Sequence, residues 1–125
     1  MKLISRSLIV VVLLMGLAMP ALTQNPAVRM TPGGSKACVK VTLKNLNTAA
    51  PITVSLAELL IFDQKTCRRL CIKRLPLNNK KIDKCQTLDF EICCPQTSLP
   101  DAPGYIYFLR ISSSAGSTQD WLFVP

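Results

Sequence analysis

The chain has 125 residues, with six Cys, no His, 49% hydrophobic residues and a formal net charge of +8. This length suits one domain, and the apolar content is too high for a disordered basic tail. Without His there is no Ser-His or Cys-His catalytic pair and no imidazole ligand for a catalytic zinc. We therefore expect no enzymatic activity and no cofactor.

Residues 1–23 have the pattern of a secretory signal peptide. Lys2 and Arg6 give a positively charged start, residues 8–17 form an apolar run of ten, and Pro20 follows. This run is too short to span a bilayer. We expect cleavage after Thr23 and secretion to the extracellular space, with an uncleaved signal anchor as the alternative. Residues 24–35, which are rich in Pro and Gly, are expected to form a flexible lead-in to the domain.

Apolar and polar residues alternate with period two in six later segments, which predicts strands. These are residues 36–43, 52–62, 68–75, 88–92, 105–112 and 120–124. The second segment has good helix formers in its later half, so a short helix is an alternative there. The third has cations on both sides of its apolar positions, which is typical of an edge strand. Residues 76–84 and 95–104 are expected to be loops.

Short strands at regular spacing, joined by turns rich in Pro, Gly and Ser, predict an all-β protein. We expect a small disulfide-bonded antiparallel β-sandwich over residues 36–125. Trp121 and Phe123 share one face of the last strand, and we expect them to lie in the core, with an exposed pair that contacts lipid as the alternative.

All six cysteines follow the expected signal peptide, and an even count in a small secreted chain predicts structural disulfides. They are Cys38, Cys67, Cys71, Cys85, Cys93 and Cys94. The neighbours Cys93 and Cys94 are poorly placed to bond each other, and Cys67 and Cys71 are too far apart on an extended segment. Several pairings remain open. We expect three disulfides, with a free or intermolecular thiol as the alternative.

Three stretches of the later half have a pattern found in a known family: KCQTLDFEI at residues 84–92, YIYFLRI at residues 105–111 and DWLFV at residues 120–124. They resemble PLAT/LH2 domains, and small secreted plant PLAT-like proteins of the embryo-specific type in particular. In this resemblance residues 38–43 match the first strand of the family and residues 54–63 the second. The resemblance implies a β-sandwich without catalytic activity that binds lipids, membranes or partner proteins.

The positive charge is concentrated in residues 65–84, which we call the basic segment. It holds eight cations and one acid, a net charge of +7, whereas the rest of the expected mature chain has five cations and six acids. The cations are Lys65, Arg68, Arg69, Lys73, Arg74, Lys80, Lys81 and Lys84.

Such a cluster creates a positive potential that attracts phosphate, sulfate or anionic lipid. The alternative, in which the segment binds nothing, is a solvated edge strand that Lys and Arg protect from aggregation. The basic segment contains no aromatic residue, so it lacks a stacking platform for single-stranded nucleic acid. If Cys67 and Cys71 form disulfides, they hold the cations in a fixed array, which favours binding.

These observations predict a secreted, non-catalytic binding module whose basic segment contacts an anionic lipid, a membrane surface or a sulfated glycan. Alternatives are a cationic host-defence or toxin-like effector and a secreted signalling or inhibitor protein with a protein partner. The acidic residues have no EF-hand spacing, so no metal site is expected. Residues 112–114 are all Ser, but no His is present to activate them.

Overall fold

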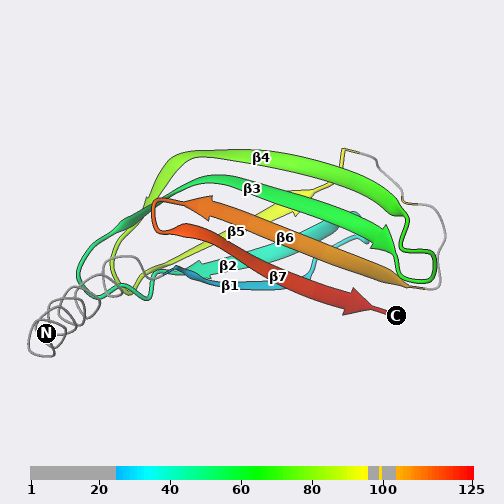
Figure 1. Cartoon of the computed structure of the whole chain (residues 1–125), viewed down its shortest axis with the longest axis horizontal. Helices are drawn as coiled ribbons and strands as arrows, with labels where there is room; N and C mark the ends of the chain where they lie inside the picture. The colour runs from blue at the N-terminus through cyan, green and yellow to red at the C-terminus, as the bar shows by residue number, and fades with distance from the viewer. Residues whose placement is uncertain (1–24, 96–98, 100–103) are drawn as a thin grey trace, which may run out of the picture.

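The computed structural model describes residues 25–95, 99 and 104–125, and this part of the chain is all-β (Figure 1). The predicted signal peptide and most of the predicted loop over residues 95–104 lie outside these residues. The strands are β1 (Ala27–Pro32), β2 (Cys38–Lys44), β3 (Ile52–Asp63), β4 (Arg69–Ile82), β5 (Thr87–Cys93), β6 (Tyr105–Ser113) and β7 (Gly116–Val124). No helix among the described residues is long and apolar enough to cross a membrane.

The strands form two antiparallel sheets that lie face to face, as expected for a β-sandwich (Figure 1). One sheet has three strands in the order β1-β2-β5, and the other has four in the order β4-β3-β6-β7. Both β4 and β7 are therefore edge strands of the four-stranded sheet.

The core lies between the sheets and follows from the alternation of each strand. Val39, Val41 and Leu43 of β2 are buried from one side, and Leu59 and Leu109 from the other. All five side chains have 1% or less of their surface exposed. The apolar second half of β3, which is also compatible with a helix, is strand because it lies centrally between β4 and β6.

The structure corrects three of the predicted boundaries. Residues 27–32 are not a flexible lead-in but strand β1, which pairs with β2 along its whole length and buries Met30. Residues 76–84 are not a loop, because β4 continues to Ile82. Pro76 is tolerated there because β4 is an edge strand, where one row of backbone N–H groups has no strand partner. The last strand also begins earlier than predicted, at Gly116.

Two disulfides form where three were expected. Cys38–Cys93 joins paired residues of β2 and β5, and Cys71–Cys94 joins β4 to the residue after β5 and so links the two sheets. Cys67 and Cys85 are free and exposed. They lie in the turns at opposite ends of β4, which spans about 33 Å because it pairs with residues 52–62 of β3. This distance is far beyond the reach of a disulfide, so these two cysteines cannot bond each other.

Two fully buried asparagines organise the connection between β2 and β3. The Asn45 side-chain amide donates to the carbonyl oxygens of Ala50 and Ile82, both at 3.1 Å, and its side-chain oxygen accepts from the Asn47 N–H at 2.9 Å. The Asn47 side-chain oxygen in turn accepts from the Ala49 N–H at 2.8 Å. These bonds satisfy polar groups that would otherwise be buried without partners.

Two further hydrogen bonds tie peripheral segments to the sandwich. The Tyr107 hydroxyl donates to the Lys36 carbonyl oxygen at 2.7 Å and holds the segment before β2 against β6. Burial raises the pKa of Tyr107 above its ordinary value of 10.0, and the neighbouring Tyr105 adds to the effect. At the other side, the Met30 N–H of β1 donates to an Asp120 carboxylate oxygen of β7 at 2.7 Å, which connects the sheets.

Candidate binding surface

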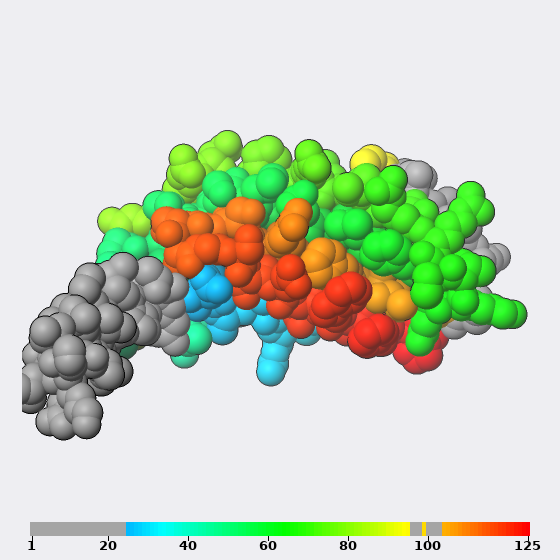
Figure 2. Space-filling view, viewed as in Figure 1, coloured from blue at the N-terminus to red at the C-terminus, as the bar shows by residue number. Residues whose placement is uncertain are grey.

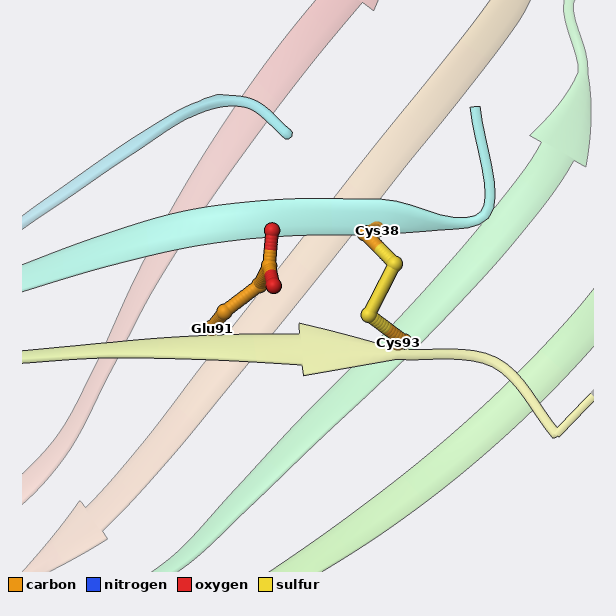
Figure 3. A group of neighbouring side chains, drawn as sticks. All are labelled: Cys38, Glu91 and Cys93. Atoms are coloured by element: carbon orange, nitrogen blue, oxygen red, sulfur yellow. A yellow bond between two sulfur atoms is a disulfide. The ribbon is translucent and has the colours of Figure 1, made fainter. Parts of the chain in front are cut away.

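One group of side chains has the composition of a metal site but does not have the chemistry of one. Donor atoms of Cys38, Glu91 and Cys93 lie within 4.8 Å of one another. Figure 3 shows that the two sulfur atoms are joined, at 2.01 Å. A disulfide sulfur is not the thiolate that binds metals. The group is therefore a disulfide with a neighbouring carboxylate and not a candidate ligand set.

The structure places all eight cations of the basic segment on β4 or in the turns at its ends. Lys65 and Arg68 lie in the β3–β4 turn, and Lys84 lies in the β4–β5 turn. The strand itself carries the remaining five, at Arg69, Lys73, Arg74, Lys80 and Lys81. All eight are exposed except Lys73, which is half-buried. They form a line along one edge of the sandwich rather than a compact cluster.

Short backbone hydrogen bonds hold the two cationic turns. In the first turn the Cys67 N–H donates to the Asp63 carbonyl oxygen at 2.7 Å, and the Asp63 N–H donates to the Arg68 carbonyl oxygen at 2.9 Å. Cys67 and Cys85 each adopt a positive φ, of 58° and 61°, which L-residues adopt mainly in tight turns. Cys67 forms no disulfide, so the expected fixing of the cations by two disulfides holds only at Cys71.

Two of the eight cations, Arg74 and Lys81, have acidic partners. Arg74 Nε lies 3.1 Å from one carboxylate oxygen of Glu58. The other oxygen of Glu58 lies 3.0 Å from Nη2 of Arg110, a residue of β6 outside the basic segment. Glu58 is buried with 7% of its surface exposed, whereas both arginine side chains remain partly in solvent. Lys81 and Asp83 are 3.8 Å apart and both exposed, so their attraction is weak. Of the described cations in the basic segment, six have no ion-pair partner among the residues that the structure describes.

The outer face of the four-stranded sheet exposes the two aromatic side chains that were expected in the core. Trp121 and Phe123 are exposed by 53% and 60%, so the prediction that they lie in the core is wrong. It is Leu122 and Val124 that turn toward the core. The Phe108 ring lies against the Trp121 ring, tilted by 48°, with ring centroids 4.5 Å apart. Figure 2 shows the surface formed by β6 and β7 alongside β3 and β4.

A signal for this surface was present in the sequence. The alternation along β6 places Ile106 and Phe108 on the side opposite Tyr107, which the sequence already shows. The structure adds the register in which β7 pairs with β6. Ile106 is opposite Phe123, and Phe108 is opposite Trp121. Directly paired residues of an antiparallel sheet point to the same face, so the two apolar pairs lie together on the outer side.

Comparison with known proteins identifies the fold but no family. No protein-family model and no curated protein matches the chain. The Northeast Structural Genomics Consortium target SoR45 superimposes with a TM-score of 0.57 at 9% identity, covering 81% of this chain and 86% of that chain. The Bordetella pertussis target BeR40, described as a 'Putative ApaA Protein', gives a TM-score of 0.47 at 14% identity, covering 80% of this chain and 89% of that chain. At 9% identity the likeness to SoR45 shows a shared β-sandwich fold alone.

Proposed function

We propose that this protein is a secreted, non-catalytic binding module that contacts an anionic surface through its basic segment. The observation that carries the proposal is the placement of eight cations along one edge strand and its two turns. Among the residues that the structure describes, only Arg74 and Lys81 of these eight lie near a carboxylate. Unpartnered, exposed cations in a row produce a positive potential that attracts polyanions and anionic lipid headgroups.

The rest of the molecule contrasts with this edge. The outer face of the three-stranded sheet carries Lys40 and Thr42 on β2 beside Glu91 and Asp89 on β5, so charges of both signs alternate there. A polyanion approaching this face meets carboxylates, whereas at β4 it meets almost only cations. The asymmetry therefore favours β4 as the contact edge.

Secretion is supported by two independent features. The start of the sequence has the pattern of a signal peptide, and the two disulfides are compatible with an extracellular location. The resemblance to PLAT/LH2 domains, which implies binding of lipids or membranes, agrees with the proposal.

The test compares two variants that lose the same charge at different places. The first carries Arg68→Ser, Arg69→Ser and Lys80→Ser in the basic segment. The matched control carries Arg29→Ser, Lys40→Ser and Lys44→Ser, three exposed positions of the three-stranded sheet. Binding is measured on phosphatidylserine vesicles and on a heparin column, over a series of salt concentrations.

We expect the first variant to bind at least about tenfold more weakly and to depend less steeply on salt, because exposed charges are screened by ions. The control should stay close to the unmodified protein. Equal losses in both variants would contradict a localised contact and would leave only a general effect of net charge. No binding of the unmodified protein to either material would reject the proposed function.

A further inference from the structure

We infer that the outer face of the four-stranded sheet lies against an anionic phospholipid bilayer, with Trp121 and Phe123 entering the lipid–water interface. This inference rests on the proposed function and identifies its partner as a membrane. It adds an apolar contact to the electrostatic one and assigns the orientation of the sandwich on the bilayer.

The register of the sheet places the apolar outer-face residues in two adjacent rows. One row runs Ile72, Leu60, Phe108 and Trp121 across β4, β3, β6 and β7. The next row begins with a cation and continues with Phe62, Ile106 and Phe123 on the other three strands. Seven of these eight outward positions are thus apolar, and we call them the apolar band.

The apolar band is unusual in comparison with the other sheet. The outward positions of β5 are Thr87, Asp89 and Glu91, and those of β2 are mainly Lys and Thr. Such polar positions are what a solvent-facing side of an antiparallel sheet requires. The four-stranded sheet instead exposes Trp121, Phe123 and Ile72, by 53%, 60% and 41%. Moving these side chains out of water lowers the free energy, so the face favours a partner with an apolar interior.

Cations border the apolar band and identify the charge of its partner. Arg69 begins the second row, and the row on the far side of the first contains Arg74, Glu58 and Arg110. Three arginines against one glutamate leave this face positive, and Lys65 in the adjoining turn adds to it. Arginine at the level of the headgroups and aromatic rings just below them is the arrangement that a bilayer interface favours.

A second copy of the chain fits this face less well than a membrane does. In a symmetric dimer the same patch meets itself, so two positively charged faces would be brought together. No acidic side chain in the three rows is free to separate them, because Glu58 is already shared by Arg74 and Arg110.

A glycan is also disfavoured as the occupant of the band itself. Sugar hydroxyls need hydrogen-bonding partners, and the seven side chains of the band offer only the indole N–H of Trp121. An acyl-chain boundary needs no such partners. A sulfated glycan therefore remains a ligand for the cations at β4, whereas the apolar band favours lipid.

The experiment uses the single Trp of the chain as its reporter, because Trp121 lies in the band. Fluorescence is recorded with vesicles of phosphatidylserine and phosphatidylcholine, with brominated lipid and with iodide in the buffer. We expect a shift of the emission to shorter wavelength, quenching by brominated lipid and protection from iodide. An iodide-accessible, unshifted Trp121 on protein bound to vesicles would overturn the inference but not the proposed function.

Variants separate the apolar contact from the electrostatic one. Phe123→Ser should weaken vesicle binding at least about tenfold but leave heparin binding unchanged, since a buried Phe contributes an apolar transfer term. Leu46→Ser, at a site that is 39% exposed outside the band, is the matched control and should change neither. Circular dichroism confirms that both variants are folded. Equal vesicle binding by Phe123→Ser, or a dimer in solution that this substitution dissociates, would reject the membrane assignment.

Discussion

Asn45 provides the sharpest test of what holds the sandwich together. Its side chain is fully buried and makes three hydrogen bonds, to Ala50, Ile82 and Asn47. Asn45→Ala removes all three. At about 1 kcal/mol for each bond, the free energy of unfolding should fall by about 3 kcal/mol. This is a large share of the stability of a small domain.

Urea unfolding followed by circular dichroism measures this loss. The matched control is Leu46→Ala at the adjacent position, whose side chain is 39% exposed and should cost less than about 1 kcal/mol. The isosteric Asn45→Asp should also destabilise at neutral pH, because a carboxylate would face two carbonyl oxygens. If Asn45→Ala costs no more than Leu46→Ala, the hydrogen bonds do not carry the stability assigned to them.

Two further predictions concern pH and covalent linkage. The raised pKa of Tyr107 means that the unfolded chain loses its phenolic proton before the folded protein does. The stability that the folded environment of Tyr107 contributes should therefore be fully present below pH 10 and be lost as pH rises through the folded pKa. In Tyr107→Phe the free energy of unfolding, measured by circular dichroism, should fall less steeply with pH over this range. Cys71 and Cys94 are 23 residues apart in sequence, and replacing both by Ala opens the loop that their disulfide closes. The free energy of unfolding, measured with urea, should fall by about 3 kcal/mol. A loss below about 1 kcal/mol would mean that packing alone joins the sheets there.

The fold was largely predictable because alternation with period two is a direct consequence of strand geometry. Val39, Val41 and Leu43 alternate with polar residues, and β2 follows them. Alternation fails where Pro and Gly dominate composition, so β1 with Pro32 was interpreted as a lead-in. It also fails at the second half of β4, where Pro76 suggests a loop although an edge strand accepts it.

The candidate surface was predictable only in part. The cations of residues 65–84 are visible as a composition, and their location at a sheet edge followed from the predicted edge strand. The apolar band was missed because β6 is apolar on both sides, and a single strand does not reveal which side faces the core. Trp121 was assigned to the core from its residue type, whereas the register with Phe108 places it outside. Pairing of the cysteines depends on distant contacts that spacing does not encode.

The adjacent residues Cys93 and Cys94 carry the covalent cross-links of the sandwich in two directions. Consecutive residues of an extended chain point to opposite sides, so Cys93 bonds sideways to Cys38 in its own sheet while Cys94 bonds across to Cys71 in the other. The two disulfides thereby cross-link strands β2, β4 and β5 at one corner of the sandwich. Under mechanical load or partial denaturation the two sheets must separate first at the end far from this corner. Amide exchange should therefore be slowest near the corner and fastest at the ends of strands far from it.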